Sequence, residues 1–205
     1  MPWMIGPGQL EFVDLGRNER IPMDRVADLV DELIDSINED ATDELIDMIL
    51  DERITVEEWE RTFSVVLKDL FILLALLGAG KMIVDWGPIE ARIAIQYGYL
   101  DRFAEQIAAG DLTGGDIRRR AHMYVNSTRQ GFWRQLDAEA KDLGYTEERW
   151  FAIGDANTCS PCAEADLMGW KPIGTFAEPG SGVVLRDPTT MCSGLTSCRC
   201  RKEYR

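Results

Sequence analysis

Histidine is nearly absent from this sequence, because His122 is the only one among 205 residues. It lies just after three consecutive arginines at 118–120. No cysteine or serine close to it in the sequence is a candidate nucleophile for it to activate. A histidine in such a setting is more often solvent-facing or hydrogen-bonded than a general base. The glycine-rich stretches at 114–115 and 180–182 match no phosphate-binding loop. We therefore expect a chain without a catalytic constellation, which is not an enzyme.

Positive charge is also scarce. Lys and Arg total 22 against 36 Asp and Glu, which gives a formal net charge of -14. This balance argues against a dedicated binder of the phosphate backbone, because such proteins gain affinity from a basic footprint. The excess of negative charge is concentrated between Asp24 and Glu60, a stretch that contains fifteen acidic residues and only two basic ones. A block of this kind favours a solvated face that aids solubility, and the alternative is a docking surface for a basic partner.

The sequence has no long hydrophobic run and no leader pattern. Residues 1–12 lack the basic start and apolar core of a signal peptide, so we expect no export. The most apolar stretch, residues 70–80, is too short to span a bilayer and directly follows two charged residues. It predicts a buried helix and no stable membrane insertion.

Apolar residues at steps of three and four predict a helical bundle over residues 22–144. Thr55 followed by Glu58 has the pattern of a capping box, and glycines at 78 and 80 mark a helix stop. Short connections favour antiparallel packing. We expect about four helices, at roughly 23–52, 55–80, 87–110 and 115–143.

The two ends of the chain differ from this body. Residues 1–21 contain scattered Pro and Gly without a period, which predicts an extended arm that either crosses a neighbouring subunit or frays. Residues 145–205 are rich in Gly, Pro and Cys, with one short strand expected at 149–154. The predicted fold class is therefore α+β, a mainly α-helical bundle followed by a small Cys-rich β/loop module.

The five cysteines all fall in this last module, at Cys159, Cys162, Cys192, Cys198 and Cys200. A C-x2-C turn and a second, distant pair of thiolates can surround one ion, which predicts a zinc-ribbon-like structural zinc site. Four of the five would suffice: Cys159, Cys162 and two of the others. Disulfides, an iron-sulfur cluster and a redox dithiol stay open as alternatives.

The module also contains a longer string of residues: Arg149-Trp150, Gly154-Asp155, Thr158-Cys159, Cys162, Gly169-Trp170, Pro172, Gly174, Pro179-Gly180, Cys192, Ser197-Cys198-Arg199-Cys200 and Tyr204-Arg205. This string, which covers about fifty-five residues, resembles the C-terminal signature of phage minor head, or head morphogenesis, proteins, including the Mu-type F proteins. Many members place a histidine three residues before Cys-Arg-Cys. Here that position is Leu195, and Cys192 is the candidate replacement ligand.

The resemblance implies a structural, minor virion component that is assembled in the host cytoplasm and associated with the portal or the inner head. It implies a role in head assembly, DNA packaging or DNA delivery. The implied partners are the portal protein, the major capsid protein or both, with self-association as a further possibility, and no small-molecule substrate is expected.

Two other functions compete with this one. The first is a zinc-knuckle module that binds nucleic acid, with Trp150 or Trp170 stacking on bases. Its cations would be Arg199, Arg201, Lys202 and Arg205. The second is a metal-dependent hydrolase with Asp155 or Glu164 as its base, although a closed four-thiolate site would leave no open coordination position for a substrate.

Overall fold

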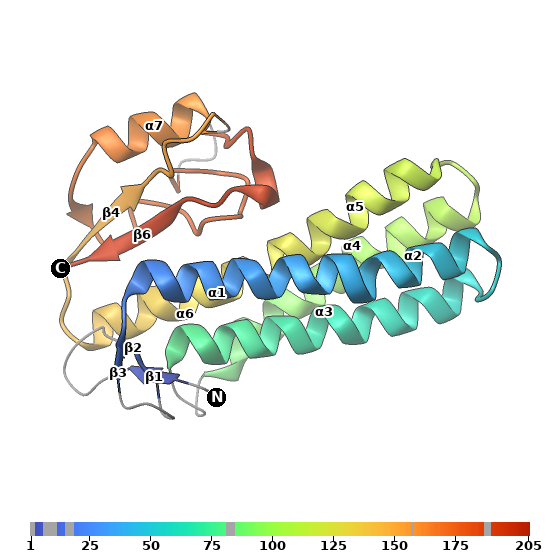
Figure 1. The fold of residues 1–205 in the computed structure, drawn as a ribbon, viewed down its shortest axis with the longest axis horizontal. Coiled ribbons are helices and arrows are strands. Elements are labelled where there is room, and N and C mark those ends of the chain that lie inside the picture. The colour runs from blue at the N-terminus through green and yellow to red at the C-terminus, as the bar shows by residue number, and fades with distance from the viewer. Residues whose placement is uncertain (1–2, 6–11, 15–18, 81–84, 157, 187–189) are drawn as a thin grey trace.

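The protein folds into an elongated helical bundle with a smaller C-terminal module beside one end of it (Figure 1). The fold is taken from a computed structural model that describes residues 3–5, 12–14, 19–80, 85–156, 158–186 and 190–205. The mainly helical α+β class predicted from the sequence is confirmed. The cysteines lie in the C-terminal module, as expected.

The bundle follows the apolar periodicity of the sequence. Its helices are α1 (Met23–Ser36), α2 (Asp43–Leu50), α3 (Val56–Ala79), α4 (Trp86–Ala108), α5 (Gly114–Ser127) and α6 (Arg129–Asp142). The predicted capping box is present, because the Thr55 hydroxyl accepts from the Glu58 backbone N–H while the Glu58 carboxylate accepts from the Thr55 N–H. Gly80 ends α3 in the left-handed conformation.

Two predicted helices are not continuous α-helices. Between α1 and α2, residues Ile37–Thr42 form a π-helical turn, η1, within the expected helix at 23–52. The expected helix at 115–143 is divided at Thr128 into α5 and α6. There the Thr128 hydroxyl donates to the Val125 carbonyl at 2.6 Å, and such back-bonding by threonine bends helices.

Helix α3 lies at the centre of the bundle. A ladder of rings from Trp59 and Phe63 through Phe103 to Tyr124 joins α3, α4 and α5, with centroid separations of 5.0 to 5.6 Å. By length and composition alone α3 could cross a membrane, but half of its most apolar window is buried inside the bundle. The burial agrees with the predicted core helix.

Helix α3 also packs unusually closely against α6. A Cβ atom at Gly78 would lie 2.1 Å from the carbonyl oxygen of Phe132. Gly78 lies inside α3, so its role is this close contact rather than the helix stop that we expected.

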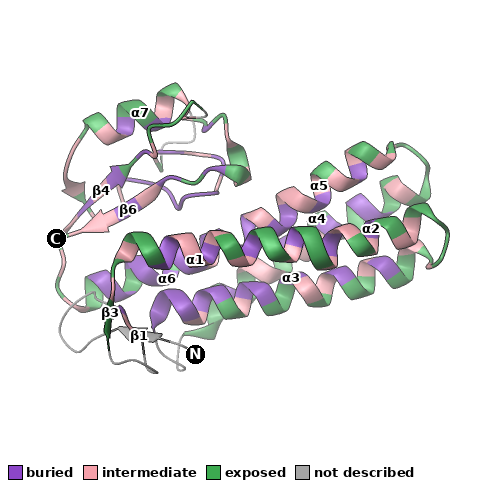
Figure 2. Ribbon diagram, viewed as in Figure 1, coloured by how far each residue is buried: buried purple, intermediate pink, exposed green. Residues whose placement is uncertain are grey.

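The exposed side of α1 and α2 carries the acidic block. Asp24, Glu32, Asp35, Glu44 and Asp47 are all exposed, and Figure 2 shows exposed residues along these helices. This placement agrees with a solvated or docking face.

The N-terminal residues correct one expectation. Instead of an extended arm, their described parts form a three-stranded antiparallel sheet in the order β1 (Trp3–Ile5), β2 (Phe12–Asp14) and β3 (Glu19–Ile21). Phe12 is fully buried and its ring centroid lies 6.3 Å from that of Phe132 in α6, which joins the sheet to the bundle core. Residues 1–2, 6–11 and 15–18 of the predicted arm lie outside the described residues.

The C-terminal module has a second antiparallel sheet, ordered β5 (Lys171–Pro172), β4 (Glu147–Phe151) and β6 (Arg201–Tyr204). Strand β4 begins two residues before the predicted strand. Its Trp150 pairs with Lys202 of β6. Two short helices, α7 (Ser160–Leu167) and the 3-10 turn η2 (Leu195–Ser197), complete the module. Helix α7 was not expected, because eight residues without an apolar face give no helical period.

Candidate metal centre

Three segments of the C-terminal module bring the cysteines together. Cys159 is the N-cap residue of α7, and Cys162 lies in its first turn, where Pro161 occupies a position that needs no N–H donor. Cys192 comes from the loop before η2. Cys198 and Cys200 lie between η2 and β6. The predicted convergence of the two ends of this module is confirmed.

The separations between sulfur atoms fit a shared ion. The Sγ atom of Cys192 lies 3.7 Å from that of Cys159 and 3.6 Å from that of Cys162, and Cys162 lies 3.9 Å from Cys198. A disulfide bond would need about 2 Å, and all five thiols are free. Four sulfurs at about 2.3 Å around tetrahedral zinc would lie about 3.8 Å from one another. The cluster can therefore hold a metal ion.

The five sulfurs are grouped as two triads. Those of Cys159, Cys162 and Cys192 all lie within 4.8 Å of one another, and so do those of Cys162, Cys198 and Cys200. Cys162 belongs to both triads. Contacts of 3.6 to 3.9 Å also connect Cys159, Cys192, Cys162 and Cys198, which is one of the sets of four sulfurs that we expected.

The cluster is buried on one side and open on the other. Cys162, Cys192, Cys198 and Cys200 are buried, whereas Cys159 is half-buried. All five line a hollow of about 440 Å³ that is open to solvent. Asp155 and Arg199 also line this hollow and form an ion pair with each other.

The thiols share protons when no cation is bound. Hydrogen bonds with Cys192, Cys198 and Cys200, followed by burial, raise the pKa of Cys162. Hydrogen bonds with Cys162 and Cys198 lower the pKa of Cys200 to about 4, and the Ile153 backbone N–H also lowers it. Since only some of these sulfurs are thiolates without a cation, metal binding must release protons.

Arg129 connects this site to the bundle. Its side chain is almost fully buried at the start of α6, and its Nη1 donates to the carbonyl oxygens of Thr196 and Cys198, both at 3.1 Å. Its Nε donates to Asp31 of α1 at 2.8 Å. Burial raises the pKa of Asp31, and the charge and hydrogen bond of Arg129 oppose that rise. One cation therefore holds the cysteine loop against two helices.

A buried charge network makes a second connection. Lys202 Nζ lies 2.5 Å from Glu148 of β4 and 2.7 Å from Asp137 of α6, and all three side chains are buried. The Tyr204 hydroxyl donates to Asp137 at 2.5 Å. Glu148 also accepts from the backbone N–H groups of Gly174 and Phe176. Sequence reasoning missed this network, because its members are far apart in the chain.

The network corrects the expectation that Lys202 is a surface cation for nucleic acid, since Lys202 is fully buried. The other three candidates are ion-paired: Arg199 with Asp155, Arg201 with Asp28 and Arg205 with Glu147. These cations thus neutralise the protein's own carboxylates.

The two candidate stacking residues are also engaged. Trp150 is fully buried. Trp170 is half-buried, and the guanidinium of Arg205 lies 4.6 Å from its ring centroid. Neither ring lies free on the surface for base stacking.

The candidate hydrolytic groups are not assembled into a site. Asp155 is paired with Arg199, and the exposed Glu164 accepts from the Ser160 hydroxyl at 2.9 Å on the same helix. His122 lies elsewhere, with its Nε2 atom 2.7 Å from Asp43. His122 therefore has a hydrogen-bond partner, as expected for a structural histidine.

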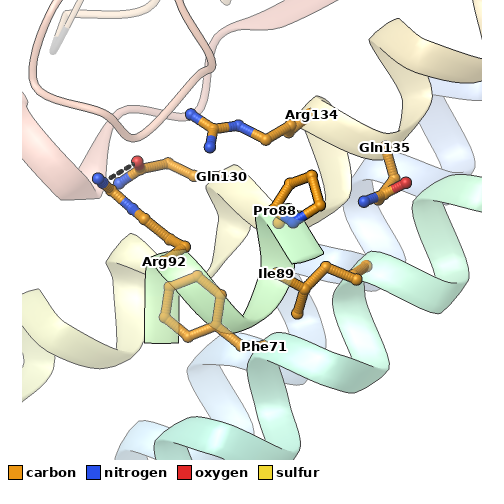
Figure 3. Close-up of a pocket in the computed structure, with 9 residues that line it drawn as sticks. Phe71, Pro88, Ile89, Arg92, Gln130, Arg134 and Gln135 are labelled. Atoms are coloured by element: carbon orange, nitrogen blue, oxygen red, sulfur yellow. Dashed lines mark hydrogen bonds between the residues drawn. The ribbon is translucent and has the colours of Figure 1, made fainter. Parts of the chain in front are cut away.

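A separate small pocket lies between α3, α4 and α6 (Figure 3). Phe71, Pro88 and Ile89 form its apolar wall, and Arg92 donates to Gln130 at its edge. Its volume of about 20 Å³ holds about one water molecule. It is too small for a substrate.

The residues of the C-terminal string lie in the module that contains the cysteines, and Tyr204 at its end packs against the bundle core. The glycines of the string, at 154, 169, 174 and 180, all have positive φ, which favours glycine because it lacks a Cβ. Trp150 packs in the same buried cluster as Cys162 and Cys198. Comparison of the chain with protein-family models, curated proteins and solved structures found no match.

Proposed function

We propose that this chain is a structural minor head protein of a tailed phage, located in the virion at the portal or the inner head. It acts there in head assembly, DNA packaging or DNA delivery, and it has no catalytic role. The observation that carries the proposal is that Trp150, near the start of the signature string, and the cysteines from Cys159 to Cys200 share one buried cluster, while Tyr204 at its end joins the module to the bundle core.

Zinc is the metal that we propose for this cluster, in a structural role. Thiolate ligands suit zinc. The observed sulfur–sulfur separations of 3.6 to 3.9 Å agree with the separation of about 3.8 Å expected around tetrahedral zinc. The module has a small buried core in which cysteines form a large part. Cross-linking by metal is the usual solution for a unit of this size.

The acidic face supports a docking role for the bundle. Exposed carboxylates along α1 and α2 are repelled by DNA and complement basic surfaces. A portal or major capsid protein with such a surface is the partner that we propose. The alternative of a nucleic-acid-binding knuckle is weakened, because Lys202 is buried and its three companions are ion-paired.

The test is to purify particles by density gradient and to quantify the chain in them by mass spectrometry. We expect the chain to sediment with the particles, in far fewer copies than the major capsid protein. Its absence from particles while it accumulates in the cytosol would overturn the proposal.

A variant pair makes this test sharper. Cys198→Ser removes a buried sulfur of the cluster, and we expect it to abolish incorporation. Ser193→Ala changes an exposed residue of the same loop and should be incorporated normally. Normal incorporation of Cys198→Ser would show that the cysteine module is not needed for docking.

A further inference from the structure

We infer that the five cysteines hold two metal ions that share the Sγ atom of Cys162, rather than one ion held by four cysteines. This inference rests on the metal centre in the proposed function and specifies its stoichiometry. It assigns Cys159 and Cys192 to one ion and Cys198 and Cys200 to the other, with Cys162 as a ligand of both.

The first argument is the position of Cys162 between two sets of sulfurs. Its Sγ lies 3.6 Å from that of Cys192 and 3.9 Å from that of Cys198. The two triads have no other member in common. A thiolate sulfur has lone pairs for two metal ions, so the shared position is chemically suited to a bridge.

The two triads draw their sulfurs from different segments of the chain. Cys159 and Cys162 are fixed by the first turn of α7, and Cys192 reaches them from its loop. Cys198 and Cys200 come from the segment between η2 and β6. Cys200 immediately precedes β6, whose pairing with β4 holds its backbone next to the sheet.

Charge balance favours the same arrangement. Five thiolates carry five negative charges, and one divalent ion would leave three of them uncompensated unless a thiol kept its proton. Two divalent ions leave only one. Four of the cysteines are buried, where net charge is costly, and the nearby Arg199 is already paired with Asp155.

The space around the cluster permits two ions. Three thiolates leave one of zinc's four usual positions open, and water commonly fills such a position. The hollow of about 440 Å³ is lined by all five cysteines, so water can reach both triads.

The test counts ions on the full-length chain under reducing conditions. We expect native mass spectrometry after zinc saturation to give two ions per chain. In a cobalt titration, the thiolate-to-metal absorption should stop rising at two equivalents. One ion per wild-type chain would overturn this inference and leave the metal centre standing, whereas no ion would overturn both.

Variants test the bridge itself. Cys159→Ser and Cys200→Ser each damage one triad and should retain one ion, whereas Cys162→Ser damages both and should retain none. Ser193→Ala, in the same module, should retain two. Retention of one ion by Cys162→Ser would rule out the bridge. The wild-type count decides the stoichiometry even where a variant fails to fold.

Discussion

Lys202 and Glu148 form an ion pair that is completely buried, with 2.5 Å between Lys202 Nζ and Glu148 Oε2. The two residues lie on paired strands of the C-terminal module, and Asp137 of α6 completes the contact from the bundle. The charge network thus binds the module to the bundle at one end, while Arg129 binds it at the other.

Replacing the buried lysine should therefore be strongly destabilising. Lys202→Met leaves Glu148 buried without its cation and leaves Asp137 with the longer ion pair to Arg186 at 3.4 Å, and we expect a loss of about 3–5 kcal/mol in the free energy of unfolding. Denaturant titration measures the change. Arg205→Met removes a solvent-exposed pair with Glu147 and should cost less than about 1 kcal/mol. Equal losses in the two variants would contradict this account.

Packing between α3 and α6 predicts opposite effects for two glycine substitutions. Gly78→Ala places a Cβ 2.1 Å from the Phe132 carbonyl, so the helices must separate, and we expect a loss of at least about 1–3 kcal/mol. Gly98→Ala, in α4, meets no atom within 4 Å and should stabilise the helix by up to about 1 kcal/mol. Thermal unfolding of both variants checks the prediction.

Removing the metal should unfold one part of the protein only. We expect a chelator under reducing conditions to abolish the hydrogen-exchange protection of residues 145–205, because the core of that module is built on its cysteines. The α3 and α4 amides should keep their protection, since their core is made of aromatic and aliphatic side chains. Unchanged exchange in the module after metal loss would show that sulfur ligation is not what stabilises it.

Alkaline pH should destabilise the fold through Tyr204. Burial, followed by the charge of Asp137, raises the pKa of Tyr204 well above its usual 10. Above pH 10 the tyrosine hydroxyl loses its proton in the unfolded chain but keeps it in the folded protein. The free energy of unfolding therefore falls as pH rises. Denaturation between pH 9 and 11 measures the slope. Tyr204→Phe should make the slope shallower, and an unchanged slope would exclude Tyr204 as its source.

The features that could be predicted from the sequence depend on local signals. The Thr55 and Glu58 capping box needs only residues three apart, and the Cys159 and Cys162 pair needs only one tight turn. The strands β1–β3 could not be found, because three-residue strands are too short to show an alternating pattern.

The candidate site shows the same division. Convergence of the cysteines follows from their number and spacing, but which sulfurs lie closest to one another depends on the fold of the whole module. The sequence favours a surface position for Lys202, because it lies close to Arg199 and Arg201 in the chain. Its partner Asp137 lies 65 residues away, and only the tertiary fold brings the two together.

Arg129 couples the movement of the cysteine loop to that of helix α6. It occupies the first position of α6, next to the bend at Thr128. Its side chain donates hydrogen bonds to the main-chain carbonyl groups on both sides of Ser197. If that loop moves, either the two hydrogen bonds from the buried Arg129 side chain break or the first turn of α6 moves with the loop. The side chain of Arg129 therefore couples the position of the cysteine loop to the bend between α5 and α6, and through Asp31 to the position of α1.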